Sequence, residues 1–207
     1  MDSWRALPAR QRVLLGVLGA AVVLANVAQP YPEIAPLQHI PTVLLLLAAP
    51  FLLRRWPLSD GAVAAGVGFC LLHTLAGRYT YSNVPYDAWS HWLTGQTISE
   101  AFGLPRNEFD RLVHLMFGIL AVPVYAEASQ RHGGASRRAA LWNALLFVGM
   151  VSAVYEIFEW LLTMVVAPDM AADYNGQQGD PWDAQKDMAT AIVGAVFAVV
   201  PRWRKAR

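Results

Sequence analysis

Apolar residues fall into six runs separated by polar segments. The runs cover residues about 13–28, 40–53, 62–76, 112–126, 139–167 and 188–200. An apolar run of about 20 residues crosses the hydrocarbon core of a bilayer as an α-helix, and several of these runs reach that length only with their polar flanks. The pattern predicts an all-α fold, a polytopic bundle of six transmembrane helices that forms a single membrane domain over residues 1–207.

Two connections between the predicted helices are long, about 78–107 and about 168–182. Connections longer than about 12 to 15 residues are often functional. In the first, four residues recur at helical spacing, which predicts a short amphipathic helix lying in the membrane interface: Tyr86, Trp89, Trp92 and Leu93. An aromatic belt that anchors the loop at head-group level explains the same residues equally well.

Basic residues are distributed unevenly between the two sides of the predicted bundle. Twelve of the 16 Lys and Arg residues precede the first helix, follow the second, lie between the fourth and fifth, or close the chain. Cytoplasmic loops of membrane proteins carry such an excess of Lys and Arg. We therefore expect both termini on the cytoplasmic side, with the two long connections facing outward.

Composition narrows the class of protein. Only 15% of the residues are charged and 56% are hydrophobic, whereas soluble domains carry about 25% charged residues. A net charge of +1 offers no concentrated basic surface, so we expect no nucleic-acid partner. The single cysteine, Cys70, excludes an intrachain disulfide and any site built from several cysteines.

Ionisable residues occur inside or at the mouths of four predicted helices, all in the outward half. They are His73, the pair Asp110 and His114, the pair Glu156 and Glu159, and the pair Asp183 and Asp187. Members of each pair are three or four positions apart, so they share one face of a helix. An ionised side chain at the centre of a span costs about 2.5 to 3.5 kcal/mol on insertion scales. We therefore expect these side chains to converge inside the bundle.

Three interpretations of this convergence are open. Polar side chains can tie helices together as a structural polar bundle, at about 0.6 kcal/mol per contact. A water-filled path for protons or ions needs ionisable groups that continue inward, but the inner halves of these helices are rich in Leu, Val, Ala and Gly. An outward-opening site that binds or transforms a ligand is the interpretation we favour.

Three motifs around these residues carry a resemblance to a known family. They are Asn107-Glu-Phe-Asp110-Arg-Leu-Val-His114, Tyr155-Glu156-x-x-Glu159-Trp160 and Gly176-x-Gln178-Gly179-Asp180-x-Trp182-Asp183-x-Gln185-x-Asp187-Met188. With them, the chain from about Tyr31 onward resembles the YjdF-type bacterial inner-membrane proteins. More distantly it is similar to the VanZ-like family, although Glu159 stands where that family typically has glutamine, and Ala191 near the position of an asparagine. The resemblance implies a multi-pass inner-membrane protein of the bacterial cell envelope.

The residue types of the cluster suit a divalent metal. Imidazole together with carboxylates suits Zn²⁺, Mn²⁺ or Fe, whereas carboxylates alone suit Mg²⁺. The predicted metal ligands are His73, His114, Glu156 and Asp187. A metal lowers the pKa of a bound water, and a nearby carboxylate can act as general base. The predicted catalytic carboxylates are Glu156, Glu159, Asp110 and Asp183.

Residues beside the cluster are candidates for holding a substrate. They are Arg78, Tyr79, Arg106, Gln178, Asp180 and Trp182. The two arginines suit a phosphate or carboxylate head group. We therefore predict a metal-dependent hydrolase or transferase that acts on a membrane lipid or lipid-linked envelope substrate. A protein that binds a lipid-linked or small polar ligand without chemistry needs the same carboxylates, whereas a structural polar bundle needs no cavity.

Overall fold

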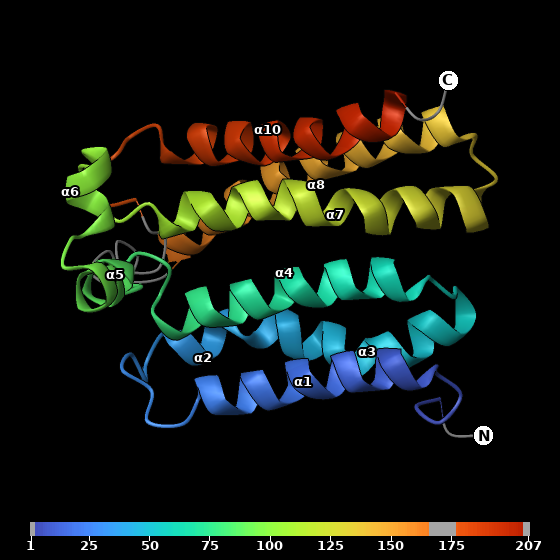
Figure 1. Ribbon diagram of the computed structural model, residues 1–207, viewed down its shortest axis with the longest axis horizontal. Coiled ribbons are helices and arrows are strands. Elements are labelled where there is room, and N and C mark those ends of the chain that lie inside the picture. Colours follow the sequence, from blue (N-terminus) through green and yellow to red (C-terminus); the bar gives the residue numbers. More distant parts are fainter. Residues whose placement is uncertain (1–2, 166–176, 205–207) are drawn as a thin grey trace.

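The chain folds into a bundle of α-helices (Figure 1). The computed structural model describes residues 3–165 and 177–204, and no β-strand occurs among them. The helices are α1 (Ala9–Ala25), α2 (Ala35–Gln38), α3 (Ile40–Arg55), α4 (Asp60–Arg78), α5 (Tyr86–Thr94), α6 (Ile98–Phe102), α7 (Phe109–Gly133), α8 (Arg137–Val165) and α10 (Asp183–Arg204). The predicted all-α class is confirmed. The end of the fifth apolar run and most of the second long connection lie outside the described residues.

Two helices begin earlier than the apolar runs predict. Helix α7 begins at Phe109 and α10 at Asp183, a turn or so before the predicted starts. Their first turns carry Asp110 and Asp183, and acidic residues interact favourably with the positive end of the helix dipole. A helix start predicted from apolar residues alone misses a first turn that is polar. The ionisable pairs of these helices therefore lie in their first two turns.

The helices form two groups that meet along one line (Figure 1). Helices α1 to α4 pack together as the N-terminal group, and α7, α8 and α10 pack together as the C-terminal group. Helix α4 lies against α7, and within the described residues no other pair of helices joins the two groups. The start of α1 and the end of α10 lie at one end of the bundle, whereas α5 and α6 lie at the other.

Four helical stretches are long and apolar enough to cross a membrane. They are Ala35–Arg55, Asp60–Arg78, Phe109–Gly133 and Arg137–Leu161. Helix α1 is short for a span, with 17 residues. Helix α10 has 22 residues but carries Asp183, Lys186 and Asp187 in its first turns. The fold is thus that of a membrane protein with several apolar spanning helices.

The N-terminal group is packed with large aliphatic side chains and is loose around α3. Its core includes Leu15, Leu18 and Val67. Helix α3 buries only Thr42 and Ala49, and most of its leucines are partly or largely exposed. Helix α3 is therefore the least tightly held of the long helices in this group.

The C-terminal group is packed with small residues that bring two backbones into contact. A Cβ atom on Gly118 of α7 would lie 2.0 Å from the carbonyl oxygen of Ala191. A Cβ atom on Gly194 of α10 would lie 2.1 Å from the carbonyl oxygen of Leu115. Small residues allow membrane helices to approach this closely. Because α7 and α10 run parallel (Figure 1), this contact fixes which turns of the two helices face each other.

The predicted amphipathic helix in the first long connection is present as α5. Trp92 and Leu93 on this helix are 83% and 71% exposed, and Phe102 at the end of α6 is 76% exposed. Helices α5 and α6 lie at the end of the bundle that also holds the first turns of α7 and α10 (Figure 1). The location of α5 in a membrane interface stays a prediction.

Candidate metal centre

Helices α7 and α10 place two ionisable pairs opposite each other. Asp110 and His114 lie two turns and one turn before Gly118, on the face of α7 that packs against α10. Asp183 and Asp187 occupy the first two turns of the parallel α10. Asp110, His114 and Asp187 are buried, and each offers a ligand atom within 4.8 Å of those of the other two. Three of the predicted site residues therefore meet at the same depth.

Helix α8 adds a carboxylate to this group. Glu156 is 8% exposed, and its Oε1 lies 3.7 Å from His114 Nε2, which is 3.6 Å from Asp110 Oδ1. Among the described residues, neither Glu156 Oε1 nor Asp187 Oδ1 has a hydrogen-bond partner. Buried polar atoms without partners are costly, so a cation or a proton would be stabilising here. Glu159, one turn further along α8, is half-buried and interacts electrostatically with Asp110 and Glu156.

Two arginines neutralise part of the negative charge. Arg106 donates from Nη1 to Asp183 Oδ1 at 2.7 Å and to the Gln177 carbonyl at 2.8 Å. Arg111 donates from Nη2 to Asp180 Oδ2 at 2.8 Å and to Asp183 Oδ1 at 3.3 Å. Nη1 of Arg106 is thus engaged with the protein, whereas Nε and Nη2 have no hydrogen-bond partner among the described residues, and its contact with a head group stays a prediction. Asp183, predicted as catalytic, is the partner of both arginines.

The polar segment before α10 is tied to the start of α7. The Gln178 side chain accepts from the Asn107 amide at 3.0 Å and donates to the Asn107 carbonyl at 2.9 Å. Asp180 accepts from Lys186 Nζ at 2.6 Å and from the Trp182 amide at 3.1 Å, and these two donors lower the pKa of Asp180 to about 2. Gln178 and Asp180 therefore join chain segments, whereas the side chain of Trp182 is 63% exposed.

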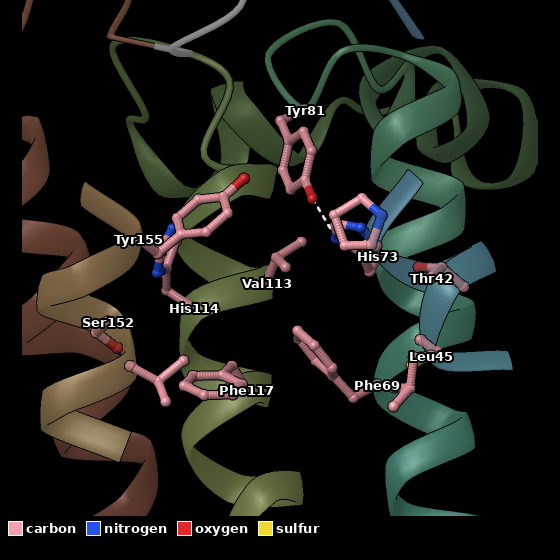
Figure 2. Close-up of a pocket in the computed structure, with 13 residues that line it drawn as sticks. Thr42, Leu45, Phe69, His73, Tyr81, Val113, His114, Phe117, Ser152 and Tyr155 are labelled. Carbon is pink, nitrogen blue, oxygen red and sulfur yellow. Dashed lines mark hydrogen bonds between the residues drawn. The ribbon is translucent and has the colours of Figure 1, made fainter. Parts of the chain in front are cut away.

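His73 lies on α4, in the N-terminal group, apart from the other predicted metal ligands. Its Nε2 donates to the Gln38 carbonyl at 3.1 Å, and its Nδ1 pairs with the Tyr81 hydroxyl (Figure 2). A carbonyl oxygen only accepts, so Nε2 carries the proton and Nδ1 accepts from Tyr81. Both ring nitrogens are engaged, and the structure does not bring His73 into the group of Asp110, His114 and Asp187.

Arg78 and Tyr79 also lie away from this group. Arg78 donates from Nη1 to the carbonyls of Ala25 at 2.7 Å and Val27 at 2.9 Å, and from Nη2 to that of Ala28 at 3.1 Å. A guanidinium stabilises a helix C-terminus, because the last carbonyl groups have no partner within the helix. The Arg78 guanidinium carbon lies 5.7 Å from the ring centroid of Tyr79. The predicted binding of a head group by Arg78 thus competes with its hydrogen bonds at the end of α1.

A cavity of about 200 Å³ lies between the two helix groups. Its polar residues include His73, Tyr81, His114 and Tyr155, and the aromatic rings of Phe69 and Phe117 line it further along (Figure 2). His114 belongs both to this cavity wall and to the group with Asp110 and Asp187. The imidazole therefore connects the candidate metal centre with the cavity.

Two residues of the site were not assigned from the sequence. Arg111 contacts Asp180 and Asp183, and its Nε lies 3.9 Å from Asp187 Oδ1. In the sequence, the sign of this role is an arginine between the acidic residues of the motif from Asn107 to His114. Tyr81 reaches His73 because the chain turns back at two left-handed residues, Thr80 (φ 50°) and Tyr81 (φ 60°). Because neither residue is glycine, the sequence carries no simple signal for this turn.

Apolar helices of membrane-spanning length, with buried ionisable residues gathered at one end, define the class of integral membrane proteins. A family model described as "Predicted membrane protein (DUF2238)" matches residues 10–206, and the chain belongs to this family. The chain is 32% identical over 169 residues to the inner membrane protein YjdF of Escherichia coli (strain K12), which covers 81% of this chain and 74% of that protein. The predicted YjdF-type resemblance is thereby confirmed. No solved structure matches the chain.

Proposed function

We propose that this chain is a multi-pass protein of the bacterial cytoplasmic membrane that holds a divalent metal ion beside the polar head of a lipid or lipid-linked substrate, and hydrolyses or transfers that head group. The observation that carries the proposal is the buried group of Asp110, His114 and Asp187, with ligand atoms within 4.8 Å of one another. Metal-to-ligand distances of about 2.0 to 2.2 Å keep the ligands of one ion within about 4.4 Å of each other. Small movements of these three side chains would therefore bring their ligand atoms to the spacing that one ion requires.

The balance of buried charge supports a cation at this position. The buried carboxylates of the site are Asp110, Glu156, Asp183 and Asp187. Asp183 is paired with Arg106 and Arg111. Removing a charged group from water is costly unless a partner compensates it. The two arginines also pair with Glu108 and Asp180, so Asp110, Glu156 and Asp187 lack a full countercharge, and a divalent ion would supply positive charge there.

The ligand chemistry supports particular metals. One imidazole with several carboxylates suits Zn²⁺, Mn²⁺ or Fe, and Mg²⁺ would use the carboxylates alone. A metal ion lowers the pKa of a bound water. Glu156 suits the role of general base, because its Oε1 has no hydrogen-bond partner within the described part of the chain. Arg106 and Arg111 would orient the carboxylates of Asp180 and Asp183. The metal ion would then be the positive charge that binds the negatively charged head group.

The topology is part of the proposal. Six crossings would comprise the four long apolar stretches together with α1 and α10. An even number of crossings agrees with the start of α1 and the end of α10 lying at the same end of the bundle (Figure 1). The excess of Lys and Arg in the segments at that end supports a cytoplasmic location for it. The metal centre would then open toward the outer face of the membrane.

Metal binding to the purified full chain tests the proposal. Zn²⁺, Mn²⁺ or Mg²⁺ should raise the midpoint of thermal unfolding, because an ion that binds the folded chain stabilises it. Asp187→Asn should weaken the apparent affinity by about tenfold or more. Glu33→Gln is the matched control, since Glu33 is an exposed acid, and it should titrate like the wild type. A wild-type midpoint that none of the ions moves would overturn the proposal.

Turnover is tested separately from binding. In Glu156→Gln the ion keeps Asp110, His114 and Asp187 as ligands, but the general base is lost. We expect metal binding within a few-fold of the wild type and turnover of a lipid phosphate at background. If the wild type turns over no lipid phosphate while both proteins bind the ion, the hydrolase or transferase activity is wrong and the metal site stands.

A further inference from the structure

A second cavity, of about 420 Å³, adjoins the one beside His114. The two cavities share Leu45 of α3 and Cys70 of α4 in their walls. The second cavity runs between α1, α3, α4 and α7 as far as Trp56 and His132. We refer to these two adjoining cavities together as the crevice; Leu45 and Cys70 lie at their junction.

The crevice is longer than one leaflet of a bilayer. On α7 the first cavity is lined from Val113 to Phe117 and the second from Val124 to His132, so the two sets of wall residues together span about 28 Å at a rise of 1.5 Å per residue. The hydrocarbon core of a bilayer is about 30 Å thick, so one leaflet supplies about half of that. An acyl chain of an ordinary phospholipid would fill only part of the crevice.

The chemistry of the walls suits an amphipathic occupant. Among the described residues no Asp, Glu, Lys or Arg lines either cavity. Polar side chains gather in the first cavity, where His73, His114 and Tyr155 form part of the wall and His114 also belongs to the candidate metal centre. Beyond Leu45 and Cys70 the wall is almost entirely apolar. A polar head near His114 and a hydrocarbon chain along α7 match this distribution.

The crevice has a side open to the surrounding membrane. Helix α3 supplies Thr42 and Leu45 to the wall and α8 supplies Ser152 and Tyr155, yet these two helices do not pack against each other. Leu45 is 48% exposed. A lipid chain could therefore enter between α3 and α8 without crossing the polar end of the bundle.

We propose that the crevice holds the single long chain of a polyprenyl phosphate, with the phosphate beside His114. This inference rests on the proposed metal site, because the crevice wall offers no arginine or lysine in the described ranges to meet the phosphate. An isoprenoid chain that reaches through both leaflets fills the whole length from Val113 to His132. The chain supplies the affinity by burying apolar surface, and the metal ion supplies the selectivity for the phosphate head.

Retention of added lipids by the purified full chain tests this assignment. Three probes are compared by native mass spectrometry: a long polyprenyl phosphate, a polyprenyl phosphate no longer than one leaflet, and phosphatidylglycerol. We expect the long polyprenyl phosphate to be retained about tenfold more strongly than the other two. Cys70, the single cysteine of the chain, gives a second measurement, because a chain in the crevice should slow its reaction with an uncharged maleimide.

A matched pair of variants on α3 locates the binding site. Leu45→Trp places a large ring where the two cavities join and should reduce retention of the long polyprenyl phosphate by about tenfold. Leu47 is 65% exposed and lines neither cavity, so Leu47→Trp should bind like the wild type. The metal-induced rise in the unfolding midpoint should be unchanged in both variants, since α3 supplies no ligand.

The outcomes separate this inference from the metal site. Equal retention of the three lipids, or unchanged retention in Leu45→Trp, would overturn the assignment of the crevice. If metal ions stabilise the chain but no lipid is retained selectively, the assignment is wrong and the metal site stands. If the long polyprenyl phosphate is selected and no ion binds, the metal site is wrong and the assignment of the chain to the crevice stands.

Discussion

The two helix groups are packed by different means. The core of the C-terminal group is dominated by Ala and Val, and its helices α7 and α10 touch through their backbones at Gly118 and Gly194. The core of the N-terminal group consists mainly of Leu and Val side chains, and a cavity lies beside α3. Backbone contact fixes the candidate ligands Asp110 and Asp187 to one depth, whereas the looser group leaves space for a long occupant. Close packing and open space are thus divided between the two halves of one bundle.

The two groups also differ in how they satisfy buried ionisable side chains. In the N-terminal group, His39 and His73 each pair through Nε2 with a backbone carbonyl of a neighbouring segment. In the C-terminal group, Glu156 and Asp187 each have a buried oxygen without a hydrogen-bond partner among the described residues. Buried polar groups in proteins are normally satisfied. The histidines therefore stabilise the fold, and the carboxylates are the groups available to a ligand.

The largest expected effect comes from breaking the backbone contact of the C-terminal group. In Gly118→Ala the new Cβ would lie 2.0 Å from the Ala191 carbonyl oxygen, so α7 and α10 must move apart. Overpacking costs about 1 to 3 kcal/mol and sometimes more, and we expect a loss at the upper end, about 3 kcal/mol. Unfolding with and without metal should show both reduced stability and a loss of the metal-induced rise.

Gly149 is the matched control for this experiment. A Cβ there meets no atom within 4 Å, and alanine favours a helix over glycine by about 1 kcal/mol. Gly149→Ala should therefore be as stable as the wild type or slightly more stable. Wild-type stability in Gly118→Ala would show that α7 and α10 are not in backbone contact.

A medium effect is expected in the N-terminal group from Arg78→Gln. The substitution removes hydrogen bonds to carbonyl groups at the end of α1, including that of Ala25 at 2.7 Å. Bonds from charged donors contribute about 1.5 to 3 kcal/mol, and we expect a loss of stability of about that size. The measurement is thermal unfolding. Metal titration should be unchanged, because Arg78 does not contact the carboxylates of α7, α8 or α10; a lost metal response would instead link Arg78 to the site.

The smallest effect is expected from Asp180→Asn at the mouth of the site. The pKa of Asp180 is about 2 in the folded chain, below its ordinary value of 3.8. Because the folded pKa is depressed, the ionised group contributes stability above pH 3.8, and the contribution is lost as the pH falls through about 2. The wild type should unfold at a slightly higher temperature than Asp180→Asn at neutral pH, and the difference should vanish near pH 2. A difference that grows with acidification would contradict the ion pair with Lys186.

The convergence of the acidic pairs could be predicted because it depends on helical spacing alone. Asp110 and His114 share a face at i,i+4, and the cost of exposing a charge to lipid turns that face inward. The partners of each side chain depend instead on which helices touch. Arg106 lies in the segment before α7, and only the folded bundle brings it to Asp183 on α10. The parallel contact through Gly118 fixes that pairing, and the spacing of charged residues does not encode it.

The separation of His73 from the metal centre could not be predicted for a related reason. Its depth on α4 matches the other ionisable residues, so the sequence groups it with them. Two non-glycine residues in the left-handed region, Thr80 and Tyr81, turn the chain so that the Tyr81 hydroxyl meets the imidazole. The crevice could not be predicted from the sequence either. An apolar run does not show whether its helix packs closely or, like α3, leaves a cavity.

The single line of contact between the helix groups has a kinetic consequence. Helix α4 meets α7 through Phe69 and Phe117, whose ring centroids are 5.2 Å apart, and through Gly66, which faces Val124. We expect a joint made by one helix pair to act as a hinge axis, and rotation about it would change the gap between α3 and α8 without disturbing either core. Hinge rotations of this kind take microseconds to milliseconds. The rate at which a long chain enters or leaves would then be set by this rotation, and stiffening the α4–α7 joint would slow exchange without altering affinity.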